Sequence, residues 1–383
     1  MPRLFHPRVL VLRDRFRGLS LVELMVGLLI SLICLLAIMS AFAAFEGRKR
    51  TTTSGSDAQQ NGLYALFELE RQVRTAGAGL TQGYNYGVWG CAMSAYAERT
   101  QQLPRASALP APFATWPHTA AAPVTMRALP VLIASGGTDS KGQVASDTLA
   151  LVAGNPATTV FKASVVGAPD SATVDVDNAF GSSDGDYVLA TTTAGDCALA
   201  KIAIASVATN RWVLSPADSP PAGLIGASQA FNLGPQPVIS LYGVDPATSS
   251  LVTYDALGRR GTKSWTVADG IVQVKALYGV DTDGDNVVDT WVTPTGAWSI
   301  TALTTDQAAA ARAFAQIKAI RVAVVAQSLL PERASDYVGA PSLKLFADLD
   351  ASLQYTISTQ PQYRYKVYDT TIPIRNALIT QHF

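Results

Sequence analysis

An uninterrupted apolar run at residues 24–45, LMVGLLISLICLLAIMSAFAAF, constrains this chain more than any other feature. Its 22 residues carry no charge, and as a helix rising about 1.5 Å per residue they would cross the roughly 30 Å hydrocarbon core of a bilayer. The run is longer than the apolar core of about 7–15 residues in a secretory signal peptide, and no small-residue cleavage site ends it. We therefore predict a transmembrane helix.

Charge divides the chain at residue 18. Residues 1–18 hold five Arg and one Asp, whereas residues 19–383 hold 24 basic and 28 acidic groups, so the whole chain is neutral. Basic residues ahead of a span favour a cytoplasmic N-terminus. We expect a single pass through the inner membrane, with the rest of the chain in the periplasm. Because the net charge is zero, the chain lacks the overall positive potential that favours binding to nucleic acid.

Glu23 interrupts the apolar character at the start of this run. A charge at the bilayer centre costs at least about 2.5–3.5 kcal/mol, so Glu23 needs a positive partner. An amine supplied by a neighbouring chain could neutralise the carboxylate in a medium of low dielectric constant. The alternative is a Glu exposed to water at the membrane interface.

The segment GLSLVELMVGLLIS at residues 18–31 resembles the N-terminus of type IV prepilins. In that family a prepilin peptidase cuts after a Gly on the cytoplasmic side and methylates the new amine, and Glu stands at the fifth mature position. The resemblance implies cleavage between Gly18 and Leu19, and an assembly role for Glu23. Leu19 stands where major pilins usually have Phe.

A second apolar pattern follows at residues 57–76, where Leu63, Leu66, Phe67, Leu69, Val73 and Ala76 recur at helical spacing. We predict one long helix over residues 19–79, with the transmembrane segment at about 24–45. The sequence TTTSGSD at 51–57 is poor in helix formers, which favours a kink or an unwound stretch there. Glycines at 77 and 79 are typical of a helix end.

Residues 80–383 are predicted to form one β-rich globular head, which makes the fold α+β with a mostly antiparallel sheet. Residues 80–125 show no clear secondary structure, and an Ala-rich helix is expected at 305–316 with Thr304 or Thr305 as its cap. Short apolar or β-branched runs between turn residues indicate strands. The predicted strands are 147–153, 186–191, 199–207, 236–243, 250–254, 271–279, 287–293, 317–327 and 363–369.

Four segments, in order along the chain, are similar to the PilW family of type IV pilus minor pilins. They are NGLYALFELERQVRTAGAG at 61–79, VKALYGVDTDGDNVVDTWV at 274–292, IKAIRVAVVAQS at 317–328 and YRYKVYDTTIPIRNALI at 363–379. The resemblance implies a pilin-like fold and a subunit that helps to initiate pilus assembly and ends at or near the fibre tip. Its implied partners are prepilin peptidase, other minor pilins, the major pilin and a tip adhesin. A type II secretion pseudopilin, which shares the N-terminal motif, is the alternative.

One cluster of residues in the sequence resembles a metal site. It consists of Asp281, Asp283, Asp285 and Asp289. Closely spaced carboxylates repel one another, and a calcium ion with oxygen ligands would relieve this repulsion. Asn286 and Val292 replace the turn Gly and the bidentate Glu of an EF-hand, so the cluster is closer to the short Asp-rich calcium loops of extracellular proteins. The alternative for this loop is a solvated acidic turn without metal. If the loop does bind calcium, an alternative function for the whole chain is a membrane-anchored adhesive or ligand-binding module that depends on calcium.

Cys91 and Cys197 follow the predicted span and would lie in an oxidising compartment, where we expect them to form a disulfide. Two separate buried thiols are the alternative, and Cys34 lies within the span. The three His, at 6, 118 and 382, are too scattered for a zinc cluster, and no nucleophile elbow or Walker loop is present. We therefore predict no enzymatic activity, and Ca²⁺ is the only cofactor that the sequence suggests.

Overall fold

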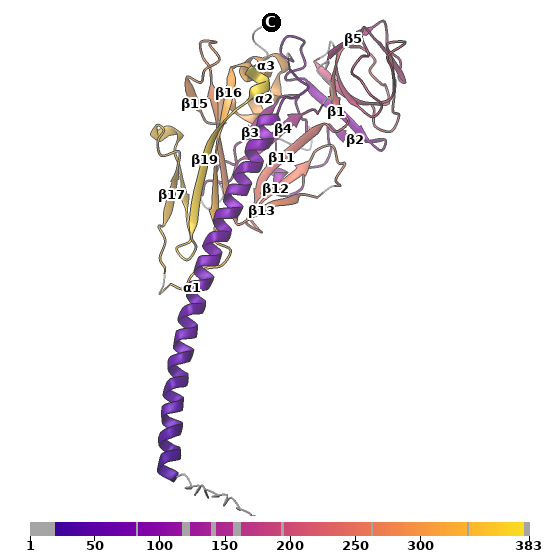
Figure 1. Ribbon diagram of the computed structural model, residues 1–383. Coiled ribbons are helices and arrows are strands. Elements are labelled where there is room, and N and C mark those ends of the chain that lie inside the picture. The colour runs from indigo at the N-terminus through magenta and orange to yellow at the C-terminus, as the bar shows by residue number, and fades with distance from the viewer. Residues whose placement is uncertain are drawn as a thin grey trace, which may run out of the picture. The chain divides into compact units, whose positions relative to one another are not determined.

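The computed structural model describes residues 20–81, 83–116, 123–138, 143–155, 162–192, 195–261, 263–334 and 337–378. The chain falls into two compact units, residues 1–53 and 54–383. The fold is α+β, with α1 (Leu21–Thr75) followed by a large, mostly antiparallel β-rich head (Figure 1).

α1 is helical through residues 51–57, so the predicted unwound stretch is wrong. A single Gly in a helix interior costs only about 1 kcal/mol relative to Ala, which is too little to break a helix that continues on both sides. The helix ends at Thr75, four residues before the predicted end. The following turn places Gly77 at φ +78°, a backbone conformation that favours glycine.

In the second unit, residues 54–75 of α1 bury a narrower stripe than predicted. Ala65, Leu69 and Val73 are fully buried, whereas Leu63 and Phe67 are 55% and 60% exposed. The buried side chains recur at intervals of four, so they lie in one row along the helix. This row joins the main hydrophobic core, and the C-terminal part of α1 therefore belongs to the same compact unit as the head.

Two antiparallel sheets contribute to the main core. One has the strand order β15 (Thr290–Val292), β14 (Ile271–Val280), β16 (Ile317–Gln327), β19 (Tyr365–Pro373). The other has the order β13 (Trp265–Asp269), β12 (Ser250–Asp255), β11 (Val238–Asp245), β4 (Thr148–Ala153), β3 (Val131–Ala134). Nearly every residue of the central strands β14, β16 and β4 is buried, in keeping with their apolar sequences. A small hairpin of β17 (Ser342–Leu345) and β18 (Tyr355–Ser358) pairs with neither sheet, but it packs against β14 and β16 through a cluster of buried side chains.

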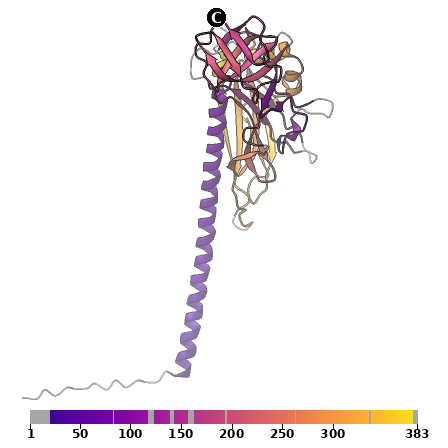
Figure 2. The same cartoon turned by 90° about the vertical axis from the view of Figure 1, so that its right-hand side faces the viewer.

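A closed six-stranded barrel is inserted between β4 and β11, which pair directly with each other. Its strands follow the order β8 (Asp196–Ser206), β7 (Tyr187–Thr192), β10 (Ala227–Gly234), β5 (Lys162–Val166), β6 (Thr173–Val176), β9 (Arg211–Leu214). The pairing of β9 with β8 closes the ring, seen around the label β5 in Figure 1 and at the top of Figure 2. The barrel encloses a core of its own that includes Trp212 and Ile202. The head, which was predicted as one unit, therefore contains the main core, the barrel core and a third, smaller cluster that includes Leu277 and Phe346.

Each of the nine predicted strands has a counterpart in the structure, but several further strands were not predicted. Residues 80–125, where no secondary structure was evident, hold β1 (Ala92–Ala97), β2 (Thr100–Leu103) and the 3-10 helix η1 (Phe113–Thr115). The sequences of these two strands, AMSAYA and TQQL, are rich in residues of low β propensity. β1 forms because it pairs with β8, in parallel, and with β2.

The predicted helix at 305–316 is present as α3 (Gln307–Gln316), and a short helix that was not predicted, α2 (Ile300–Thr305), precedes it. The caps are Ser299, which accepts a hydrogen bond from the N–H of Ala302, and Asp306, which accepts one from the N–H of Ala309. The prediction of Thr304 or Thr305 as the cap is wrong, because these hydroxyls donate to carbonyl groups of the preceding turn. Three short helices complete the fold: η2 (Gly296–Trp298), η3 (Ala351–Leu353) and α4 (Arg375–Leu378).

A buried ion pair ties β14 to the segment that precedes β4. Asp147 and Lys275 are in direct contact, and their side chains are 0% and 1% exposed. The Asp147 carboxylate also accepts hydrogen bonds from the N–H groups of Gly136 and Ala276, both at 3.0 Å, and the Lys275 ammonium donates to the carbonyl of Ala145. Because both charges are fully partnered, this pair links the two sheets without leaving an unsatisfied charge.

Candidate functional site

The first unit presents an apolar helix with no protein around it. Residues Leu21–Ala43 form a 23-residue helical stretch that is long and apolar enough to cross a membrane, and none of it is buried. Leu21, Leu24 and Leu28 are 76%, 54% and 62% exposed. A helix that is apolar on all sides requires lipid or other apolar helices around it.

Glu23 lies in the first turn of this helix and is exposed. Its carboxylate forms no hydrogen bond or ion pair with any residue that the structure describes. The predicted processing site, Gly18 and Leu19, lies outside the described residues.

Three of the four aspartates predicted as calcium ligands come together after β14. Asp281, Asp283 and Asp285 each offer an oxygen atom within 4.8 Å of the others. Asp289 is directed elsewhere, because one oxygen accepts 2.7 Å hydrogen bonds from both the N–H and the hydroxyl of Thr282. The loop turns at Asn286, whose φ is +69°. Asn tolerates this left-handed conformation, so it can serve where an EF-hand has glycine.

Lys318 of β16 supplies a positive charge next to this loop. Its ammonium lies 3.5 Å from the Asp281 carboxylate, with both side chains buried, and it donates to the side-chain oxygen of Asn286. Asp281 also accepts hydrogen bonds from the N–H groups of Gly284 and Asn286. Burial alone would raise the pKa of Asp281, but these hydrogen bonds and Lys318 outweigh it and lower the pKa. The loop is therefore held by internal contacts, and Asp283 and Asp285 remain exposed for a cation.

We expect millimolar Ca²⁺ to stabilise the detergent-solubilised full chain if this loop binds calcium. An extracellular-type site with a dissociation constant of about 0.1–1 mM would add about 1–3 kcal/mol at 10 mM Ca²⁺. Thermal unfolding with and without Ca²⁺ measures the shift, and the double variant Asp283→Asn, Asp285→Asn should abolish it. An unchanged melting temperature in the unmodified chain would show the loop to be a metal-free turn.

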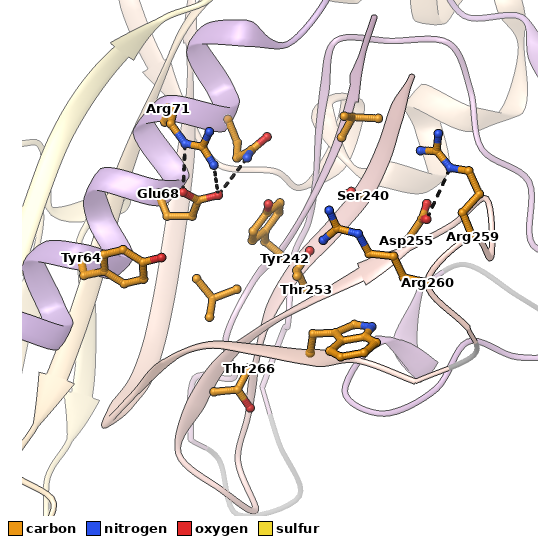
Figure 3. A pocket seen from close by; sticks show the side chains of 14 residues that line it. Tyr64, Glu68, Arg71, Ser240, Tyr242, Thr253, Asp255, Arg259, Arg260 and Thr266 are labelled. Carbon is orange, nitrogen blue, oxygen red and sulfur yellow. Dashed lines mark hydrogen bonds and ion pairs between the residues drawn. The ribbon is translucent and has the colours of Figure 1, made fainter. Parts of the chain in front are cut away.

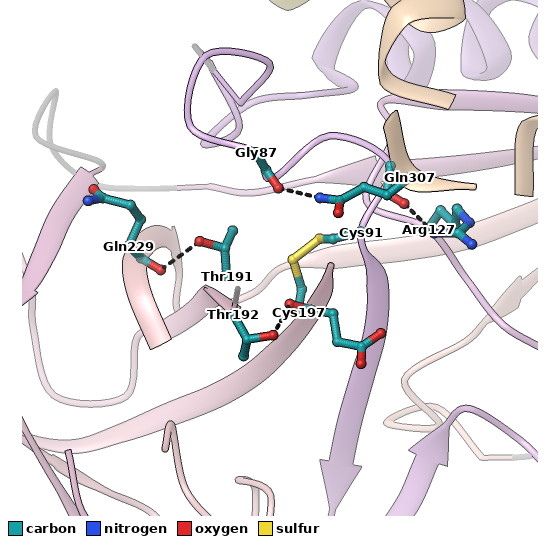
Figure 4. Close-up of a disulfide and its surroundings, with 10 residues drawn as sticks. Gly87, Cys91, Arg127, Thr191, Thr192, Cys197, Gln229 and Gln307 are labelled. Carbon is teal, nitrogen blue, oxygen red and sulfur yellow. Dashed lines mark hydrogen bonds between the residues drawn. A yellow bond between two sulfur atoms is a disulfide. The ribbon is translucent and has the colours of Figure 1, made fainter. Parts of the chain in front are cut away.

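Cys91 and Cys197 are joined by a disulfide, with 5.6 Å between their Cα atoms and 106 residues between them in sequence. Cys91 immediately precedes β1, and Cys197 lies on β8, where it is opposite Met93 in the parallel pairing (Figure 4). Both cysteines are buried. Since β8 belongs to the barrel and β1 belongs to the segment that leads from α1, the disulfide fastens the inserted barrel to the rest of the head.

The double variant Cys91→Ser, Cys197→Ser should lose about 2–4 kcal/mol of unfolding free energy, because the unfolded chain regains the freedom of a loop of about 100 residues. Urea unfolding of the full chain measures this loss, and Cys34→Ser, which alters only the exposed apolar helix, is the matched control. Equal stability of the double variant and the unmodified chain would contradict a stabilising disulfide.

A groove of about 800 Å³ lies between the C-terminal half of α1 and the sheet β11–β12–β13. In Figure 3, Tyr64 and Arg71 on α1 face Tyr242, Thr253 and Arg260 across the hollow. No sequence motif predicted this groove, because its walls are about 170 residues apart in the chain. Only the packing of α1 beside the five-stranded sheet brings them together.

Comparison with known proteins finds two family matches, one near the N-terminus and one in the C-terminal part of the chain. Residues 13–39 match the family model of the prokaryotic N-terminal methylation motif, and residues 242–376 match that of type IV pilus-assembly protein W, PilW. Residues 242–376 are therefore similar to the PilW family. No curated protein and no solved structure matches the chain. The two family matches together support a minor pilin related to the type IV pilus.

The PilW match begins within β11 and ends within α4. It includes the whole four-stranded sheet, in which three of the four PilW-like segments of the sequence form β14–β15, β16 and β19. The barrel lies outside both matches. The residues that match a family are therefore those of the N-terminal methylation motif and those from β11 to α4, which include the four-stranded sheet.

Proposed function

We propose that this chain is a minor pilin that takes part in the initiation of type IV pilus assembly and sits at or near the pilus tip. The observation that carries the proposal is Glu23, whose carboxylate has no partner among the described residues and which lies in the first turn of an apolar helix that is not buried. Prepilin peptidase would cut between Gly18 and Leu19 and methylate the new amine.

Neutralisation of the Glu23 carboxylate lowers the free energy of the assembled state. An isolated carboxylate in an apolar medium is costly, and the amine of an adjacent subunit restores charge balance where attraction is strongest. The exposed leucines of the same helix then pack against neighbouring helices instead of lipid. The same pairing sets the axial alignment of the subunits, because only one register brings amine and carboxylate together.

The head would make the contacts that distinguish this subunit from the major pilin. We propose that it binds other minor pilins and a tip adhesin, first from the periplasmic side of the inner membrane and then on the fibre at the cell surface. The disulfide at Cys91 and Cys197 fits an oxidising compartment of this kind. We propose no catalytic role for any residue.

Mass spectrometry of purified pili tests this function. The expected result is a mature chain that begins with N-methylated Leu19 and co-purifies with other pilins. A chain that begins at Met1 and stays in the membrane fraction would instead be a tethered periplasmic protein. Loss of protein secretion with normal pili in a deletion strain would identify the alternative, a type II secretion pseudopilin.

A further inference from the structure

The groove between α1 and the five-stranded sheet has the side chains of a protein-binding site. Three aromatic residues line it: Tyr242, which is buried at its floor, and Tyr64 and Trp265, which are 52% and 53% exposed. Tyr, Trp and Arg are the residues that most often dominate the binding energy of protein interfaces. Large aromatic rings left half exposed around one hollow therefore offer a contact surface that the fold itself does not use.

Positive charge is left uncompensated on one wall of the groove. Arg71 pairs with Glu68 and Arg259 pairs with Asp255, so these four charges cancel. Arg260 and the nearby Lys263 are exposed and form no hydrogen bond or ion pair with any part of the chain that the structure describes. Burial raises the pKa of the Tyr242 hydroxyl, and the nearby charge of Arg260 opposes part of this rise. Arg260 thus presents one unpaired cation within the groove, and Lys263, three residues further along the chain, carries a second outside its lining.

The free edge of a sheet lies on the same wall. β13 begins at Trp265 and is the last strand of its sheet, and among the described strands it pairs only with β12. An edge strand exposes backbone N–H and C=O groups that an extended peptide can pair with. Trp265 and Thr266 of this strand line the groove and are both exposed.

We propose that this groove receives an extended acidic segment of a neighbouring pilus subunit. The segment adds to the edge of β13 through its backbone, its carboxylates pair with Arg260 and Lys263, and an apolar side chain packs between Trp265 and Tyr64. The identity of the partner as a pilus subunit rests on the proposed function, whereas the chemistry of the segment rests on the groove alone. Single-stranded nucleic acid, whose phosphates could also pair with cations, is the competing occupant that the test below distinguishes.

A peptide titration of the detergent-solubilised full chain tests the chemistry. The probe is a peptide of about ten residues with alternating Glu and Val, which favours an extended strand, and the comparison probes are a Lys–Val peptide of the same length and an oligothymidylate. We expect the Glu–Val peptide to bind, more weakly at high salt, and the double variant Arg260→Glu, Lys263→Glu to lower its affinity at least about tenfold. The matched control is Lys344→Glu, Lys366→Glu, which reverses two exposed lysines outside the groove and should change nothing.

Three outcomes of the titration would overturn the proposal: no binding of the Glu–Val peptide, equal binding by the groove variant, or tighter binding of either comparison probe. In cells, a photo-crosslinker in place of Thr266 should form an adduct with an acidic segment of another pilus subunit. An adduct with any other kind of segment would also overturn it. If the chain binds the peptide but is absent from purified pili, the proposed function fails while the chemistry of the groove stands.

Discussion

Replacing Glu23 with Ala should remove this subunit from purified pili. The amine of the adjacent subunit would then have no carboxylate partner among apolar helices, at a cost of at least about 2.5–3.5 kcal/mol. Since about 1.4 kcal/mol corresponds to a factor of ten, incorporation should fall about 100-fold. Quantitative mass spectrometry of sheared pili, normalised to the amount of the subunit in the membrane, measures the effect.

Ser31→Ala is the matched control in the same helix. The Ser31 hydroxyl only donates to the carbonyl of Leu28 within its own chain, so its loss should leave incorporation unchanged. Glu23→Gln keeps the size of the side chain and removes its charge, and it should fail as the Ala variant does. Normal incorporation of both Glu23 variants would contradict an electrostatic role for this residue.

Replacing Asp147 with Ala should cost about 3–5 kcal/mol of unfolding free energy, because it leaves the buried Lys275 ammonium without its counter-ion. The pair is fully buried, and the carboxylate also holds the N–H groups of Gly136 and Ala276. Urea unfolding of the full chain measures the loss. The slope of the unfolding free energy against urea concentration, the m-value, should be the same in the variant and the unmodified chain.

A double variant separates the charge from the packing. Asp147→Leu with Lys275→Met replaces both charges by apolar side chains, and it should recover much of the loss, as expected for buried ion pairs. Arg211→Ala is a control at an exposed ion pair, that with Asp175, and should leave the unfolding free energy nearly unchanged. A loss for Asp147→Ala as small as that of the control would show that Lys275 finds another partner or loses its charge.

Local signals predicted much of the secondary structure of the head. β14, β16 and β4 are continuous apolar runs bounded by turn residues, so their own sequences identify them as buried strands. The strands β1, β2 and β13 carry no such signal, since their residues are mixed or exposed. They form because a longer partner strand supplies hydrogen bonds, and partners distant in sequence are invisible to local patterns.

The candidate sites divide in the same way. The spacing of Asp281, Asp283 and Asp285 in the sequence was enough to predict that they cluster, because residues close together in a short loop stay close in space. The contact of Asp281 with Lys318, 37 residues further on, depends on the pairing of β14 with β16. Asp289 belongs to the same sequence cluster, yet its hydrogen bonds to Thr282 direct it away from the other carboxylates.

By itself, the sequence determined the apolar helix, the position of Glu23 in it and the α+β class, because helix periodicity and an uncharged run of bilayer length are local properties. The tertiary structure alone decided that a barrel closes between β4 and β11, that the disulfide fastens this barrel to β1, and that α1 and β13 border one groove. Each of these features joins segments that are far apart in the chain, and such contacts depend on how whole sheets and helices pack.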